Sequence, residues 1–296
     1  MKALSSMRVR AAMLSALMLL TIMALWHAGT APRSTVSAPV AVALTPEQIE
    51  YAKLMGKDPA ALAAGETKKA DGFPTPAQLW NAVATNLADP FYDNGPNDKG
   101  IGIQLAHSLA RVGLGFAIAA AVAIPLGFLI GMSPLLYKAL DPFIQVLKPI
   151  SPLAWMPLAL YTIKDSSISG IFVIFICSVW PMLINTAFGV AGVRRDWLNV
   201  AKTLEVSPLR KAFQVILPAA APTILTGMRI SMGIAWLVIV AAEMLVGGTG
   251  VGYFVWNEWN NLALTNVIFA ILVIGVVGML LDALFAQAQR VVTYVD

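Results

Sequence analysis

Long apolar runs separated by short polar ones dominate the chain. About 20 consecutive apolar residues suffice to cross a bilayer as a helix, and six runs reach that length. They extend from about Val9 to Trp26, Leu105 to Met132, Asp141 to Ile163, Ile168 to Val193, Pro222 to Val246 and Thr265 to Ala288. The pattern predicts an all-α membrane protein with six spans.

Prolines and glycines mark special places in these runs. Pro149, Pro152 and Pro157 interrupt the third run, whose first part we expect to lie along the inner membrane surface. Pro181 lies inside the fourth run, where it suits a gate or a static kink equally well. Gly127 and Gly131 form a pair of small residues four apart, which predicts close helix packing.

The first run has two interpretations. Basic residues precede it and the small residues Ala28 to Ala31 follow it, which also fits a secretory signal peptide. We expect a retained transmembrane helix over residues 1–28. An extramembrane segment, 29–104, then follows, with a helix-like piece from Pro46 to Met55. A five-helix core over 105–290 and a short tail over 291–296 complete the predicted organisation.

Composition agrees with a membrane protein. Hydrophobic residues make up 58% of the chain and charged residues 12%, unlike an ordinary soluble domain. The single Cys177 excludes a disulfide framework, and His27 and His107 lie apart from it, so no metal centre is expected. The net charge of +4 comes from basic residues beside the apolar runs, which argues for membrane topology rather than nucleic-acid binding.

The basic residues predict the orientation of the chain. Lys and Arg near span ends are retained on the cytoplasmic side. The short loops of one side hold only Lys164, and the loop from Gly247 to Asn261 holds no basic residue. The other side carries Lys2, Arg8, Arg10, Lys138, Arg194, Arg195, Lys202, Arg210, Lys211 and Arg290. We therefore expect both termini and the loop 194–218 in the cytoplasm, and residues 29–104 on the periplasmic side.

The loop 194–218 is amphipathic. Apolar residues recur at helical spacing in two sets, which are Trp197, Val200, Ala201 and Leu204, then Leu209, Ala212, Phe213 and Ile216. Two short helices are predicted, with Ser207 as the N-cap of the second and Pro208 at its first position. We expect Leu217-Pro218 to end this helix just before the fifth span.

The spacing in this loop resembles the coupling loop of binding-protein-dependent ATP-binding-cassette (ABC) importers. Their permeases carry Glu-Ala-Ala, three residues, Gly, nine residues, Ile, one residue and Leu-Pro. Alignment on Leu217-Pro218 puts Asn199, Val200 and Ala201 at the triplet, Val215 at the isoleucine and Glu205 at the glycine. A glutamate there is expected to cost on the order of 1 kcal/mol, unless the turn is built differently.

A wider resemblance extends from about Pro74 to the C-terminus. The nitrate-transport permease family, with relatives for bicarbonate, cyanate and sulfonates, is similar to this chain in several stretches. These are Asp89–Asp93, Gly95–Gly100, His107–Leu109, Pro152–Trp155, Phe172–Phe175, Trp180-Pro181, Ile184–Ala187 and Ala235–Leu245.

The resemblance implies a six-span type I importer permease in the bacterial inner membrane. Its partners would be a second permease copy, two cytoplasmic ATPase subunits and a periplasmic or lipid-anchored substrate-binding protein. The residues implied to contact the ATPase are Trp197, Asn199, Val200, Ala201, Leu204, Glu205, Leu209, Phe213, Leu217 and Pro218.

Energy is expected to come from those partners. The chain contains no Gly-x-x-x-x-Gly-Lys-Ser/Thr sequence, so ATP and Mg²⁺ would be bound by the partner subunits, and we expect no cofactor on this chain. The run Gly247 to Gly252 lacks the lysine of a phosphate cradle, and we expect a flexible external turn.

Polar and aromatic residues within the spans are candidates for the translocation pathway or its gate. These are Gln145, Trp180, Asn185, Trp236 and Glu243. Each has a structural alternative, which is hydrogen bonding between helices for the amides, packing for the tryptophans, and bonding to backbone for Glu243. Lys148 and Asp282 are expected to reach cytoplasmic water. An anion pathway need not contain a fixed cation, so the absence of a mid-membrane arginine does not count strongly against nitrate.

The function predicted from these features is ATP-driven import of nitrate, or of nitrate and nitrite. The same machinery for bicarbonate, cyanate or a sulfonate is the nearest alternative. A gradient-driven transporter or channel, or a membrane enzyme, would need intramembrane coupling residues or a catalytic cluster, and neither is evident in the sequence. The sequence does not distinguish a homodimer of this permease from a heterodimer with a homologous one.

Overall fold

The computed structural model describes residues 2–30, 73–95 and 98–292. These residues form helices and loops, apart from one isolated β-bridge between Asp93 and Lys99. The predicted helix-like piece from Pro46 to Met55 lies outside them, as do most of segment 29–73 and the tail beyond residue 292. The chain divides into two compact units, Met1–Ala82 and Val83–Asp296.

In the first unit, α1 (Lys2–Thr30) contains an apolar stretch of membrane-crossing length, Val9–Thr30. Near its end the indole N–H of Trp26 donates a hydrogen bond to the carbonyl of Pro74, 2.9 Å away. The same ring meets Phe73 edge-to-face at 6.0 Å. The predicted first apolar helix is confirmed, whereas its retention stays a prediction because a leader helix would have the same pattern.

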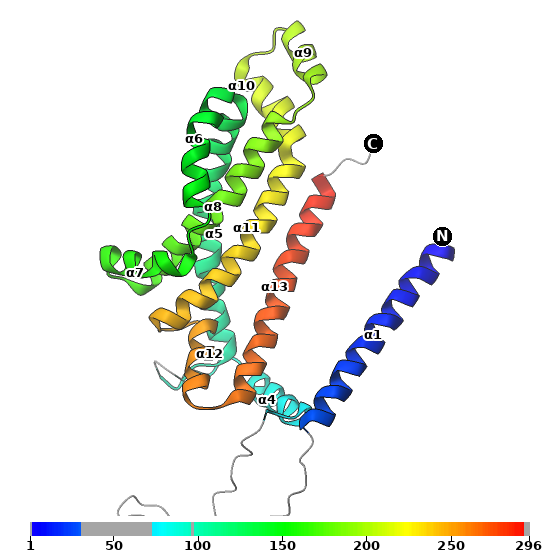
Figure 1. Cartoon of the computed structure of the whole chain (residues 1–296), viewed down its shortest axis with the longest axis vertical. Coiled ribbons are helices and arrows are strands. Elements are labelled where there is room, and N and C mark those ends of the chain that lie inside the picture. The colour runs from blue at the N-terminus through cyan, green and yellow to red at the C-terminus, as the bar shows by residue number, and fades with distance from the viewer. Residues whose placement is uncertain (1, 31–72, 96–97, 293–296) are drawn as a thin grey trace, which may run out of the picture. The chain divides into compact units, whose positions relative to one another are not determined.

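Three long helices form the centre of the second unit. These are α5 (Ile101–Met132), α8 (Ser166–Ala191) and α11 (Leu217–Val246), and α13 (Leu264–Val292) lies along α11. Together with α1 they are the five individual helices of membrane-crossing length and polarity in the described part of the chain. In Figure 1, α5, α8, α11 and α13 run side by side within the second unit.

Small residues allow α5 and α8 to approach closely. A Cβ atom at Gly127 would lie 2.7 Å from the carbonyl oxygen of Leu183, and one at Gly131 would lie 2.6 Å from that of Ala187. Contacts this short are not tolerated, so both positions require glycine. The predicted role of this pair in helix packing is confirmed.

The interrupted third run forms two helices rather than one. α6 (Pro134–Leu147) and α7 (Pro152–Ile163) meet at an angle of 90°, and counted together they make a sixth candidate span. α6 follows the direction of the long helices, whereas α7 turns across them (Figure 1). The predicted break is confirmed, but the part that departs from the span direction is the second, because the chain turns at the prolines between them.

The fifth span begins earlier than predicted. After α9 (Arg195–Thr203), the helix starts at Pro208 as α10 (Pro208–Lys211), continues through a π-helical turn over Ala212–Ile216, and runs on as α11. The prediction that Leu217-Pro218 ends a separate helix is therefore wrong. Pro218 lacks an N–H and crowds the preceding turn, and the wider π turn before it provides room for the ring.

The opposite end of the second unit carries the loop before α5 and the short helix α12 (Val251–Asn260). In the loop, Lys99 Nζ pairs with Asp93 at 3.1 Å, and the backbone N–H of Gly95 also donates to that carboxylate. These two donors lower the pKa of Asp93 from its ordinary value. The ion pair closes the turn that precedes α5.

Candidate functional site

The end of the molecule formed by α9 and α10 exposes large apolar side chains. Two of the predicted contact residues on α9 are 47% exposed (Trp197) and 59% exposed (Val200), and Leu204 at its C-cap is 70% exposed. Leu209 and Phe213 on the next helix are 74% and 66% exposed. Such a concentration of exposed apolar residues at the end of the helix bundle, beside charged residues, marks an interaction surface. We call these five residues the apolar contact surface.

The other residues predicted for this contact differ in accessibility. Asn199, Glu205 and Pro218 are exposed, and Leu217 is half-buried. Ala201 is buried. Of the predicted set, Ala201 is thus placed to support the surface rather than to touch a partner.

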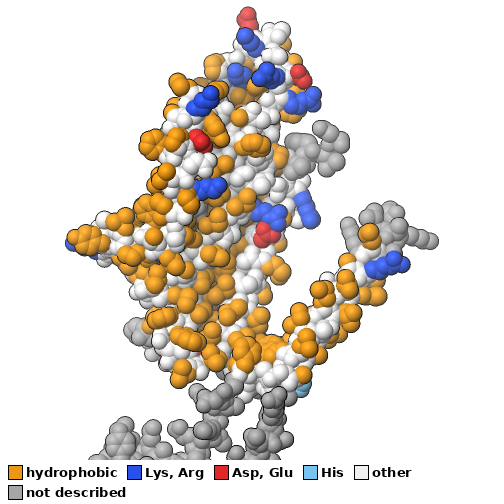
Figure 2. Space-filling model, in the orientation of Figure 1, with side chains coloured by type: hydrophobic (Ala, Val, Ile, Leu, Met, Phe, Trp, Pro, Cys, Tyr) orange, Lys and Arg blue, Asp and Glu red, His pale blue; other side chains and the backbone are white. Residues whose placement is uncertain are grey.

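Basic side chains surround the apolar contact surface. The guanidinium of Arg194 lies over the ring of Trp197, 5.8 Å from its centre, and also pairs with Asp196 at 3.3 Å. Arg210 donates to Gln214. Figure 2 shows several blue Lys and Arg side chains gathered at this end, with orange side chains along the flanks. An apolar centre with a polar, charged rim is the usual arrangement of a protein–protein interface.

Glu205 ends α9 in a left-handed conformation, with φ of 49°. The N–H of Val206 donates to the carbonyl of Ala201, and the N–H of Glu205 donates to that of Lys202. This pair of bonds is the Schellman arrangement, in which glycine is the usual left-handed residue. The turn is therefore built as in the family pattern, and the glutamate adopts the conformation that glycine would adopt more easily.

The conformation of Glu205 gives a direct prediction. We expect Glu205→Gly to raise the free energy of unfolding by about 1 kcal/mol, because glycine has no Cβ penalty at positive φ. Thermal unfolding of the purified protein in detergent measures the change. Glu205→Ala is the matched control, since it removes the carboxylate but keeps the Cβ. An equal gain in both variants would attribute the effect to charge and contradict this explanation.

A buried charge cluster lies at the other end of α11. Glu243, in the last turn of this helix, is 4% exposed. One carboxylate oxygen accepts from Arg111 Nη1 at 2.7 Å, and Ser108 Oγ lies 2.9 Å and 2.8 Å from the two oxygens. Arg111 Nε also donates to Ser167 at 3.0 Å. The cluster thus joins α5, α8 and α11.

The glycine run after α11 folds over this cluster. The N–H groups of Gly250, Val251 and Gly252 donate to Gln104 Oε1, Ser108 Oγ and Glu243 Oε2, at 2.5, 2.9 and 3.1 Å. A Cβ at Gly250 would collide with the carboxylate of Glu243. The predicted flexible turn is therefore wrong for this part of the run, because its backbone is fixed by side chains of α5 and α11.

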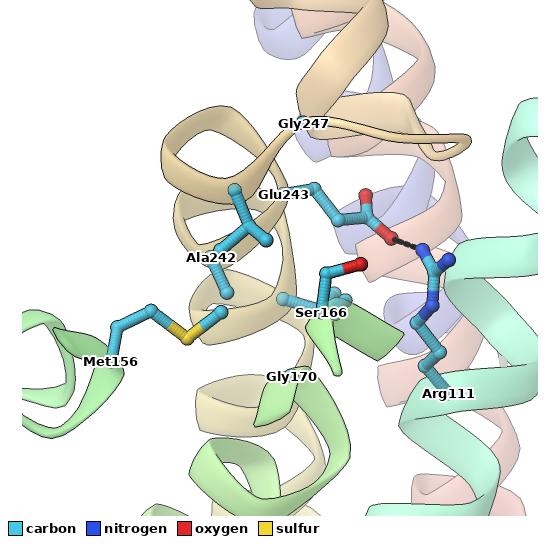
Figure 3. A pocket seen from close by; sticks show the side chains of 9 residues that line it. Arg111, Met156, Ser166, Gly170, Ala242, Glu243 and Gly247 are labelled. Atoms are coloured by element: carbon cyan, nitrogen blue, oxygen red, sulfur yellow. Dashed lines mark hydrogen bonds and ion pairs between the residues drawn. The ribbon is translucent and has the colours of Figure 1, made fainter. Parts of the chain in front are cut away.

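A small pocket adjoins the cluster (Figure 3). Arg111 and Glu243 point toward each other at one side of it, and Met156 of α7 faces them from the other side. The pocket is also lined by Ser166 at the start of α8, Gly247 just after α11, Gly170 and Ala242. The bent helix α7 therefore reaches the same region as the ion pair.

The predicted pathway residues are spread over several helices. Trp236 is buried and donates its indole N–H to the carbonyl of Ile274, 3.0 Å away. Asn185 donates to Pro181 in its own helix, and Trp180 is half-buried. Gln145 is exposed on α6 and lies 3.4 Å from Asp141. No hydrogen bond among the described residues joins any two of the five, so their pathway roles stay predictions.

Sequence reasoning missed the partners of Glu243 and one further arginine. Gln104, Ser108 and Arg111 follow helical spacing on one face of α5, which is the signal that would have revealed them. Arg229 of α11 forms a two-point ion pair with Asp282 of α13, at 2.5 and 2.6 Å. The prediction that the spans lack a mid-membrane arginine is wrong, because Arg111 and Arg229 both lie inside predicted spans.

Comparison with known proteins identifies the family. Residues 123–293, more than half of the chain, match the family of the inner membrane component of binding-protein-dependent transport systems. The chain belongs to this family. The permease is 46% identical over 220 residues to the nitrate import permease protein NrtB of Synechocystis sp., covering 74% of this chain and 80% of that protein.

A bicarbonate relative is about equally similar. The bicarbonate transport system permease protein CmpB of the same organism is 45% identical over 223 residues, covering 74% of this chain and 80% of its own. Among solved structures, the inward-facing MetNI methionine ABC transporter aligns with a TM-score of 0.57 at 14% identity, over 64% of this chain and 94% of that one. The predicted family, ABC permease fold and inner-membrane location are confirmed.

Proposed function

We propose that the permease forms the nitrate pathway of an ATP-driven importer and receives its energy from separate ATPase subunits that dock on the apolar contact surface. The observation that supports this most directly is the exposure of Leu204, Leu209 and Phe213 at one end of the molecule, amid basic residues. With both termini in the cytoplasm, that end faces the compartment that supplies ATP.

The continuous helix from Pro208 to Val246 supports the proposed mechanism. In the proposed cycle two permease copies bind two ATPase subunits, and ATP-Mg on those subunits drives their closure. A displacement at Phe213 then passes along the rigid helix to Glu243 and to the glycine run bonded to it. A loaded binding protein docks on the opposite face, so α11 connects the energy source with the face that receives the substrate.

Nitrate is proposed rather than bicarbonate because of the sequence resemblance to nitrate-transport permeases. Since one relative is named for each anion, the two substrates have to be compared directly. Both anions are planar and monovalent, so the same donors in a pathway can solvate either one. Specificity is expected to lie mainly in the substrate-binding protein. Bicarbonate is therefore a second candidate, favoured by the 45% identical relative.

Reconstitution tests the proposal. The permease, its co-purified ATPase and binding protein are placed in proteoliposomes, and uptake of labelled nitrate is measured with ATP, without ATP and with an ion gradient alone. We expect uptake only with ATP and binding protein, and competition by nitrate but not by bicarbonate. Uptake of bicarbonate alone would overturn the substrate, and uptake on a gradient without ATP would overturn the importer.

A further inference from the structure

Arg229 and Asp282 form a charged pair on the outer surface of the helix bundle. Nε and Nη2 of the arginine bind the two carboxylate oxygens, at 2.5 and 2.6 Å. The arginine side chain is 39% exposed and the aspartate side chain 54% exposed. Around them α11 and α13 present mainly apolar residues.

The helix contacts place this pair deep within the spans. Ser231 of α11 donates to the carbonyl of Ser178, which is the thirteenth of the 26 residues of α8. Arg229 is two residues from Ser231, or about 3 Å along the axis. Asp282 lies four residues beyond the middle of α13, or about 6 Å along it. Both distances are well within the half-thickness of about 15 Å of the hydrocarbon core.

Charges at this depth do not face hydrocarbon without a large energetic cost. Ionisable side chains in membranes face the protein interior, a partner or a water-filled cavity. Here the pair is open on one side within the second unit, so the described residues of that unit do not cover it. The surface between α11 and α13 is therefore turned away from lipid.

We propose that this surface lines the translocation pathway and that Arg229 binds the passing monovalent oxyanion. Asp282 occupies the Nε and Nη2 edge of the guanidinium. Nη1 has no hydrogen bond to any of the described residues. Guanidinium N–H groups bind planar oxyanions with matched geometry. The paired carboxylate cancels the net charge, which keeps anion binding weak enough for release.

A second polar contact extends the same surface toward the α9 end. Gln289 of α13 donates to Thr226 of α11 at 2.9 Å, one turn of α11 from Arg229. Asp282 and Gln289 thus give α13 two polar contacts to α11 along this line. The arrangement provides hydrogen-bonding groups on the way from the middle of the membrane to the predicted cytoplasmic end.

Transport assays with three variants test the site, which rests on the proposed importer. We expect Arg229→Gln to lower nitrate uptake at least tenfold, because Asp282 then repels the anion, while ATPase activity stimulated by binding protein persists. Arg229→Lys retains part of the uptake. Arg229→Leu/Asp282→Leu removes both charges and fills the contact, so full uptake in this variant would overturn the proposal.

Two alternative explanations predict results that differ from those of an anion site. If the surface joins two permease copies instead, Arg229→Gln releases monomers on size exclusion, and uptake and ATPase activity fall together. If the importer hypothesis itself is wrong, the unmodified protein shows no ATP-dependent uptake.

Chemical labelling gives a second, independent test. In a Cys177→Ala background, Asp282→Cys is expected to react with a charged, water-soluble thiol reagent, and nitrate is expected to slow the reaction. Leu126→Cys, on the apolar exposed stripe of α5 at similar depth, is the matched control and stays unlabelled. Absence of labelling at position 282 in the importer assembled with its ATPase and binding protein would contradict an aqueous pathway there.

Discussion

Leu204→Asp and Phe213→Asp are each expected to release the ATPase subunits while the permease remains folded in the membrane. Both side chains are about two-thirds exposed, so neither substitution disturbs the core. A buried apolar anchor at the centre of an interface commonly contributes about 2 kcal/mol or more, which corresponds to a loss of affinity of about 30-fold. Placing a carboxylate there adds the cost of burying an unpaired charge.

Pull-down of the ATPase by tagged permease measures this loss, and ATP-dependent uptake is expected to fall with it. Gln214→Asp is the matched control, because it adds the same charge one position away, at a residue that is exposed and bonded to Arg210. We expect the control to retain the ATPase. Unchanged assembly of Leu204→Asp and Phe213→Asp would show that the apolar contact surface does not bind the ATPase.

The apolar pattern was sufficient to predict most of the fold. Each predicted span corresponds to a membrane-length helix or to the bent pair, because hydropathy and backbone satisfaction leave helices as the available structure. The continuation of the helix from α10 through the π turn into α11 was missed because Pro218 is normally read as a helix end. A proline can end a helix or follow a π turn that accommodates its ring. For Pro218 the choice depends on packing around Ile216, which is buried.

The candidate sites were predictable to different degrees. The apolar contact surface follows helical spacing over a few neighbouring residues, so the sequence contains it. The charge cluster could not be predicted in this way, because Arg111 and Glu243 are separated by 132 positions and meet only when α5 packs near α11. Sequence reasoning identified Glu243 as an unusual residue and offered bonding to backbone as one explanation. Its bond to Gly252 agrees with that explanation, whereas the arginine could be found only from the packing.

Glu243→Ala and Arg111→Ala are each expected to destabilise the permease strongly. Removing one member of a buried ion pair leaves the other charged and uncompensated, which costs about 3–5 kcal/mol. In Glu243→Ala the N–H of Gly252 also loses its acceptor. Thermal unfolding in detergent, followed by tryptophan fluorescence, is expected to show a large fall in melting temperature for both variants.

Two comparisons separate pairing from a general loss of packing. Arg111→Met/Glu243→Met removes both charges and keeps much of the volume, so it is expected to be more stable than either alanine variant. Lys99→Ala breaks the ion pair with Asp93, whose side chain is 51% exposed, and is expected to cost at most about 1 kcal/mol. A double variant as unstable as the sum of the two single ones would show that the residues act independently and contradict the buried pair.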